Sequence, residues 1–129
     1  MVLADAFEGQ PLVRPNDLVI DKTLYATNGD HIVAFDVQAD GSVTNPRRWA
    51  ETGDDGLAID NAGRLYAAIG AGGIRVVSPK GEILGTIPTP VGMQSVGFAG
   101  RDKKTMFAVG RGAAYRIAML AEGIKSRAK

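Results

Sequence analysis

The sequence contains no cysteine and only one histidine among its 129 residues. Without cysteine, the chain has no disulfide bond, no thiolate zinc site and no cysteine nucleophile. A single histidine also excludes a three-histidine zinc site within one subunit. This residue, His31, lies in the turn-like segment NGDHI, and we expect it to be a solvated loop residue.

Two further features are missing, namely a long apolar run and an excess of charge of one sign. No run approaches the roughly 20 apolar residues that a membrane-spanning helix needs. The 15 basic and 14 acidic residues leave a net charge of +1, which provides no electrostatic basis for binding nucleic acid or an anionic membrane. The first residues, MVLADAFEGQ, lack the basic region of a signal peptide. We therefore expect a soluble, cytoplasmic protein with neither partner.

Glycine and apolar residues, by contrast, are plentiful. Seventeen glycines and six prolines indicate many turns. Hydrophobic residues make up 45% of the chain, which is enough for a folded core. The length corresponds to one domain. Together these features predict a single all-β fold.

The sequence repeats itself with a period of about 40 residues. The segments NDLVID, DGLAID and QSVGFA begin at Asn16, Asp55 and Gln94, each 39 residues after the one before. Tyr25, Tyr66 and Phe107 are spaced by 41 residues. Four short strands per repeat of this length are typical of β-propeller blades; the alternative is a β-sandwich with chance similarity. We predict four-stranded blades at about residues 15–52, 53–91 and 92–120.

The third repeat lacks a fourth strand, and an unassigned strand, VLADAF (residues 2–7), precedes the first repeat. Three blades do not close a ring, because propellers typically have 4 to 8 blades and an open arc exposes sheet edges. A C2 homodimer would close a six-bladed propeller, with strand 2–7 of each chain completing the third blade of the other. We therefore expect residues 1–120 to form a half-propeller that pairs with itself, followed by a polar tail at 121–129.

Several phrases together resemble the gluconolactonase / senescence marker protein / luciferin-regenerating enzyme family of six-bladed propellers. They are VLADAFEGQPLVRPND, HIVAFDVQADGSVTNPRRWAE, DDGLAIDNAGRLYAA, GGIRVVSPKGEILGTIPTP and SVGFAGRDKKTMFAVG. The resemblance implies a metal-dependent hydrolase of small lactones or related esters, with the metal at the propeller mouth. Calcium is the first choice, and zinc and manganese are alternatives. A family member is about twice as long as this chain, and the family's metal-binding glutamate is missing here.

The resemblance also implies site residues. Asp55, in the Asp55-Gly56 turn, matches the family's metal-binding aspartate, which also serves as the general base. Asn16 matches less closely, because its blade continues like the metal-asparagine blade while EGQPLVRPND resembles a phrase that contributes a substrate-binding asparagine. An ordinary turn role for Asn16 stays open.

Spacing adds further candidates. Gln94 shares the position of Asn16 and Asp55 before an innermost strand, where a side-chain oxygen would face the propeller axis and a hard cation. We also consider four residues for substrate binding, and each has a simpler alternative. Gln94 could instead be an unremarkable polar residue, Asp17 a turn residue, Asn28 a turn asparagine, and Arg14 an exposed side chain.

Two other functions stay open. A non-catalytic half-propeller that assembles or binds a small ligand would keep the fold and lose the activity. A split enzyme would instead obtain the missing blades and the glutamate from another polypeptide. Metal binding and oligomeric state separate these possibilities from a homodimeric lactonase.

Overall fold

All the regular structure in the described part of the chain is β-strand, which confirms the predicted all-β class. The computed structural model describes residues 1–13, 15–53 and 55–125. The strands are β1 (Ala6–Phe7), β2 (Gln10–Pro11), β3 (Pro15–Ile20), β4 (Thr23–Asn28), β5 (His31–Val37), β6 (Val43–Ala50), β7 (Leu57–Ile59), β8 (Leu65–Ile69), β9 (Gly73–Val77), β10 (Ile83–Ile87), β11 (Ser95–Ala99), β12 (Thr105–Gly110) and β13 (Ala113–Ala118). Within the described residues, no helix is long and apolar enough to cross a membrane.

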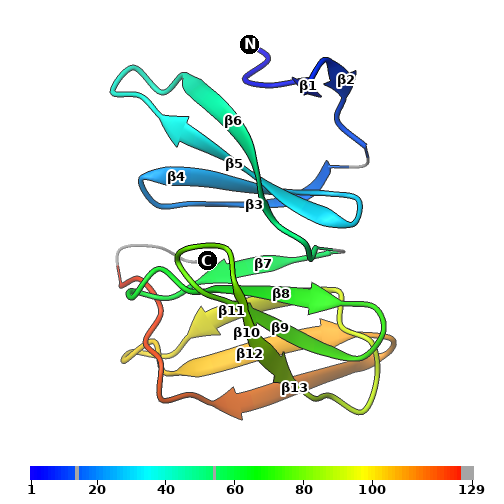
Figure 1. The fold of residues 1–129 in the computed structure, drawn as a ribbon. Helices are drawn as coiled ribbons and strands as arrows, with labels where there is room; N and C mark the ends of the chain where they lie inside the picture. The colour runs from blue at the N-terminus through cyan, green and yellow to red at the C-terminus, as the bar shows by residue number, and fades with distance from the viewer. Residues whose placement is uncertain (14, 54, 126–129) are drawn as a thin grey trace.

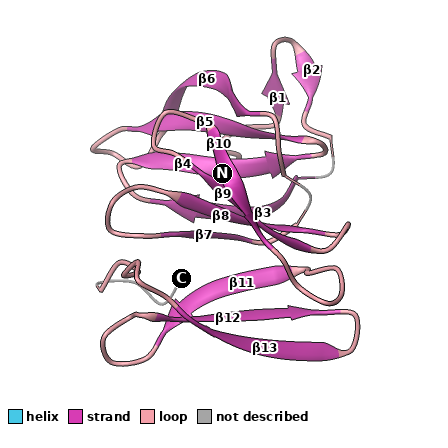
Figure 2. Cartoon of the chain, turned by 60° about the horizontal axis from the view of Figure 1, so that its bottom comes forward, coloured by secondary structure: helices cyan, strands magenta, loops and turns pink. Residues whose placement is uncertain are grey.

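The strands form three antiparallel meanders and one small hairpin. Strands β3 to β6 make a four-stranded sheet, β7 to β10 a second one, and β11 to β13 a three-stranded sheet. The hairpin consists of β1 and β2. The sheets are stacked in chain order (Figures 1 and 2), and the first strands β3, β7 and β11 lie beside one another. This is the arrangement of consecutive propeller blades.

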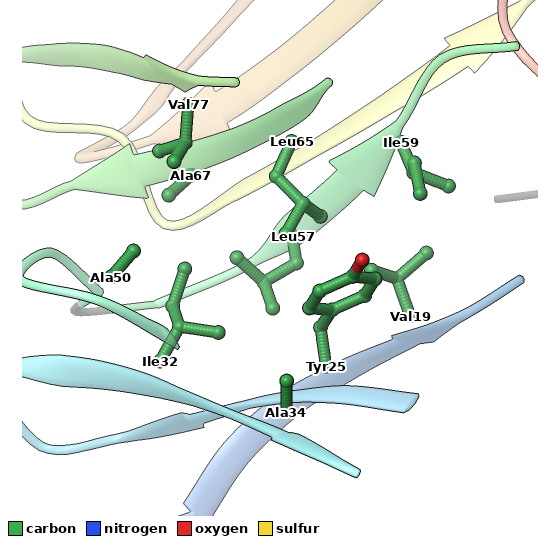
Figure 3. Close-up of a cluster of buried hydrophobic side chains, with 10 residues drawn as sticks. All are labelled: Val19, Tyr25, Ile32, Ala34, Ala50, Leu57, Ile59, Leu65, Ala67 and Val77. Atoms are coloured by element: carbon green, nitrogen blue, oxygen red, sulfur yellow. The ribbon is translucent and has the colours of Figure 1, made fainter. Parts of the chain in front are cut away.

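The second sheet is buried on both faces. In β8, Leu65 and Ala67 face the first sheet, whereas Tyr66 and Ala68 face the third. Strands buried on both sides read as continuous apolar runs rather than alternating ones, which explains the segment LYAAI. Figure 3 shows the cluster between the first two sheets, formed by Val19, Tyr25, Ile32, Ala34, Ala50, Leu57, Ile59, Leu65, Ala67 and Val77.

The contact between the second and third sheets contains an aromatic pair. The rings of Tyr66 and Phe98 lie 5.1 Å apart at an interplanar angle of 83°. Edge-to-face pairs of this kind add about 0.5–1.5 kcal/mol beyond the area they bury. The spacing of the two sheets is therefore set by specific side chains as well as by general burial.

A third apolar cluster lies on the far side of the first sheet. Leu24, Val33 and Phe35 are buried there, and Ala4 and Phe7 of the N-terminal segment pack on them. Residues 2–5 form no strand, and β1 pairs only with β2. Of the predicted strand 2–7, only Ala6–Phe7 is β-strand. The segment nevertheless covers part of the outer face of the first sheet.

Candidate functional site

Three residues with the same place in the repeats meet at one end of the stacked sheets. Asn16 lies at the start of β3, Asp55 lies just before β7, and Gln94 directly precedes β11. Asn16 Nδ2 donates a hydrogen bond of 2.5 Å to Asp55 Oδ1. A hollow of about 420 Å³ is lined by Asn16, Asp17, Asp55, Gly56, Gln94 and Ser95. The structure thus brings together four of the predicted site residues, Asn16, Asp17, Asp55 and Gln94.

Hydrogen bonds between neighbouring sheets hold this end together. Asp17 Oδ2 accepts a hydrogen bond of 2.7 Å from the backbone N–H of Leu57, which joins the first sheet to the second. The backbone N–H of Gly56 donates to the carbonyl oxygen of Gln94 at 2.8 Å, which joins the second sheet to the third. The hollow therefore rests on backbone that is tied across both sheet boundaries.

Asp17 holds the backbone of the site in place through hydrogen bonds to backbone groups. Its second carboxylate oxygen, Oδ1, accepts from the N–H of Leu18 at 2.9 Å. The fully buried Thr27 accepts from the N–H of Asp17 at 3.0 Å through Oγ1. Both carboxylate oxygens of Asp17 thus already accept backbone hydrogen bonds, in keeping with the turn role considered above.

Gly56 is required by the close approach of the second and third sheets. A Cβ atom at this position would lie 2.6 Å from Ser95 Cα and 2.9 Å from the carbonyl oxygen of Gln94. Both neighbours are backbone atoms, which cannot rotate away as a flexible side chain would. The glycine beside Asp55 therefore lets the third sheet approach the candidate site.

Asn28 is buried in a separate network and does not line the hollow described above. Only 5% of its surface is exposed. Its Oδ1 accepts from the backbone N–H of Val13, and its Nδ2 lies 3.2 Å from His31 Nε2. In this structure Asn28 ends β4 and anchors the segment before β3, and its role in substrate binding stays a prediction.

The expectation that His31 is a solvated loop residue was wrong. His31 begins β5 and is 8% exposed. Its Nδ1 lies 2.8 Å from Asp30 Oδ1, and this hydrogen bond is the main reason that the pKa of Asp30 is lowered. The Phe7 ring lies 6.2 Å from the imidazole. A polar turn sequence carries no signal that a distant segment will cover it.

The charge of the hollow is negative, because Asp17 and Asp55 line it and no basic residue does so among its described lining residues. Arg14, predicted to orient an anionic substrate, lies outside the described residues. Sequence reasoning also missed Ser95, a hydroxyl in the lining. Its signal was the repeat spacing, since Ser95 follows Gln94 as Asp17 follows Asn16.

The oxygen donors of the hollow suit a hard cation in kind. Carboxylate, amide and hydroxyl oxygens are the ligands that Ca²⁺ takes, usually six to eight of them. Asp55, Asn16, Gln94 and Ser95 supply these atom types. Among the described residues, however, no group of three or more acidic, histidine or cysteine side chains could hold a metal. One chain therefore offers part of a coordination shell.

Comparison with known proteins shows to which family the chain belongs. The sequence profile described as SMP-30/Gluconolactonase/LRE-like region matches residues 21–109. The chain belongs to this family. No curated protein sequence matches it significantly.

Solved structures support the same fold. A gluconolactonase of Xanthomonas campestris is 27% identical, with a TM-score of 0.72 over 84% of this chain and 38% of its own. Regucalcin of Agrobacterium tumefaciens, described as a calcium-binding protein, is 16% identical, with a TM-score of 0.76 over 85% of this chain and 47% of its own. The chain thus spans less than half the length of each of these two proteins.

Proposed function

We propose that this chain is a metal-dependent hydrolase of small lactones or related esters, with Asp55 as ligand and general base. The observation that carries the proposal is the Asn16–Asp55 hydrogen bond within a hollow lined by oxygen-bearing side chains. Membership of the SMP-30/gluconolactonase family and the likeness to a gluconolactonase support it.

The residues of the hollow would share the work. Asp55, Asn16 and Gln94 would hold the divalent cation, with Ca²⁺ preferred and Zn²⁺ or Mn²⁺ as alternatives. A bound cation polarises a lactone carbonyl and lowers the pKa of a water molecule. Asp55 accepts a proton from the attacking water as its oxygen bonds to the carbonyl carbon. The ring C–O bond then breaks, and the leaving alkoxide oxygen takes the proton that Asp55 had accepted, which restores the carboxylate. Asn16 keeps the carboxylate of Asp55 oriented through Nδ2.

Asp55→Asn tests this role directly. We expect the variant to lower kcat/KM toward an active sugar lactone by about 100-fold or more, because general-base catalysis contributes about that factor. Calorimetric titration with Ca²⁺, Mn²⁺ and Zn²⁺ should show weaker metal binding, since a carboxylate is replaced by an amide. Asp102→Asn is the control: Asp102 accepts from the N–H of Lys104 in the β11–β12 turn, and an amide oxygen preserves that bond. Lactone turnover that is unchanged in Asp55→Asn would refute the proposal.

A non-catalytic module that binds calcium or a small ligand is the second candidate. It is favoured by the partial ligand set, because Asp17 is occupied by backbone donors and Asp55 is the other carboxylate in the lining. It is also consistent with the likeness to a protein described as calcium-binding. Metal binding without turnover of any sugar lactone would support it over the hydrolase.

A further inference from the structure

The two outer faces of the sheet stack carry the same kinds of residues as its internal contacts. We propose that a second copy of this chain packs its first sheet on the third sheet of this copy, and its third sheet on the first. The two copies would form a ring of six blades, within the usual range of 4 to 8. The ring would bring together two copies of the candidate site, and its consequence for catalysis rests on the proposed function.

An equivalent apolar position in the first strand of each sheet provides the first argument. Leu57 and Val96 occupy the same place in the second and third repeats and are 0% and 3% exposed, because each is covered by the preceding sheet. Leu18 holds this place in the first repeat and is 52% exposed. Among the described residues, no sheet covers Leu18 as the preceding sheets cover Leu57 and Val96.

Aromatic positions in the second strands provide the matching argument at the other end. Tyr25 and Tyr66 are 9% and 3% exposed, and each packs in the cluster shared with the following sheet. Phe107 holds the same place in the third repeat and is 46% exposed. Tyr66 packs edge-to-face on Phe98 in β11, and the residue in β3 that corresponds to Phe98 is Ile20. We therefore expect Phe107 to meet Ile20 of the second copy.

The rest of the open face of the third sheet suits close packing. Phe107 pairs with Gly97 and Arg116 across the sheet, and Val109, 44% exposed, pairs with Ser95 and Ala114. These neighbours are small apart from Arg116, so a facing sheet could approach closely. The two outer faces are thus complementary. The first sheet can accept a sheet in front of it, and the third sheet can accept one behind it.

The N-terminal segment lies where a fourth strand would be needed. Ala50 of β6 packs in the cluster between the first and second sheets, and Ile87 of β10 packs in the cluster between the second and third. Ala4 and Phe7 hold the corresponding place on the open face of the first sheet. In the proposed ring this segment lies next to β13 of the second copy, which is the edge strand of a sheet with three strands in the described part of the chain.

A second copy is favoured over an unrelated partner because one chain contains both halves of the contact. A two-fold arrangement uses each half once and leaves no open end. It also places two Asn16–Asp55 pairs around one opening, which would supply the oxygen ligands that one chain lacks.

The experiment measures the mass of the 129-residue chain in solution by light scattering after size exclusion. We expect twice the 13.5 kDa of one chain. Leu18→Lys and Phe107→Glu should each give monomers, because a charge would be buried at both contacts. Mixing the two variants should restore the dimer, since one contact is then native and the other pairs lysine with glutamate. Leu84→Glu is the control: Leu84 lies on β10 and is 58% exposed, similar to Leu18.

The outcomes separate this inference from the proposed function. A folded monomer of the unmodified chain would refute the proposed ring, and so would monomeric variants that do not form a dimer when mixed. The two outer faces would then be expected to bind blades of a different chain. Circular dichroism checks that each variant is folded. A dimer without metal binding or lactone turnover would refute the hydrolase and leave the ring intact. Turnover by a monomer would do the reverse.

Discussion

Asp60 shows how a single buried charge organises a turn. It is 1% exposed and accepts hydrogen bonds from the N–H groups of Ala62 and Arg64, both at 2.9 Å. Its other oxygen accepts from Arg64 Nε at 2.7 Å and from the hydroxyl of Tyr66 at 3.0 Å. A buried carboxylate is tolerated when it is paired and fully hydrogen-bonded in this way. The turn at Asp60–Gly63, which joins β7 to β8, is therefore also an anchor for β8.

Tyr66 should make the folding stability depend on alkaline pH. Burial, reinforced by the charge of Asp60, raises the pKa of Tyr66 from 10.0 to about 12. The folded state then holds its phenol proton more tightly than the unfolded state. This contribution is fully present below pH 10 and is lost as the pH rises through about 12; its size is on the order of 2–3 kcal/mol.

Two measurements check this prediction. Phenolate absorbance should show a component that titrates near pH 12 and is absent from Tyr66→Phe. The denaturant midpoint of the unmodified protein should fall between pH 10 and 12 more steeply than that of Tyr66→Phe. Complete ionisation of all tyrosines well below pH 12 in the folded protein would contradict the assignment.

Neighbouring sheets are joined by different devices at equivalent positions. Between the first and second sheets, the carboxylate of Asp17 reaches across to the backbone of Leu57. Between the second and third, Gly56 in the equivalent place has no side chain and lets the backbones touch directly through Gln94. The repeats therefore share a geometry without sharing the residues that produce it.

Gly56→Ala should disturb both the sheet contact and the site. The added methyl group would meet backbone atoms at 2.6 and 2.9 Å, and we expect a loss of about 1–3 kcal/mol in unfolding free energy. Metal affinity should also fall because Gln94 moves away from Asp55. Gly85→Ala in β10 is the matched control, since its Cβ would meet nothing within 4 Å. Urea denaturation and calorimetry would measure both effects, and equal stability of the two variants would contradict the close-contact explanation.

The molecule as a whole is an arc with two apolar end faces. Leu18 and Phe107 mark these ends, with 52% and 46% of their surfaces exposed. Because a covering copy binds the folded state only, it would stabilise folding by mass action. Assembly and stability are therefore expected to change together.

Thermal unfolding should consequently depend on protein concentration. If two copies close the ring, a tenfold increase in concentration contributes about 1.4 kcal/mol and raises the Tm by roughly 2–4 °C. Scanning calorimetry over a hundredfold range would measure this shift. The monomeric variant Leu18→Lys should show none. A concentration-independent Tm for the unmodified chain would argue that each arc folds alone.

Local pattern and repeat spacing were sufficient for the class of fold, and the resemblance of several phrases to a known family indicated the family, which the sequence profile confirms. Alternating and continuous apolar runs separated by glycine turns specify strands because strand faces have a period of two. The 39-residue spacing also identified Asn16, Asp55 and Gln94 as equivalent, and the structure lines one hollow with all three. Their proposed roles in metal and substrate binding stay predictions.

Contacts between distant segments were decided by the tertiary structure alone. Asn28 and His31 flank the turn between β4 and β5, a segment whose composition suggests solvent, yet Val13 bonds to Asn28 and the Phe7 ring lies beside His31. Asp17 looked available for a ligand, yet its oxygens accept the backbone N–H groups of Leu18 and Leu57. A sequence specifies strands through neighbouring residues, whereas burial and hydrogen-bond partners depend on which remote backbone arrives beside a side chain. The order and periodicity of the strands could be predicted along the chain. The hydrogen-bond partner of each buried polar group was decided only by how the sheets pack together.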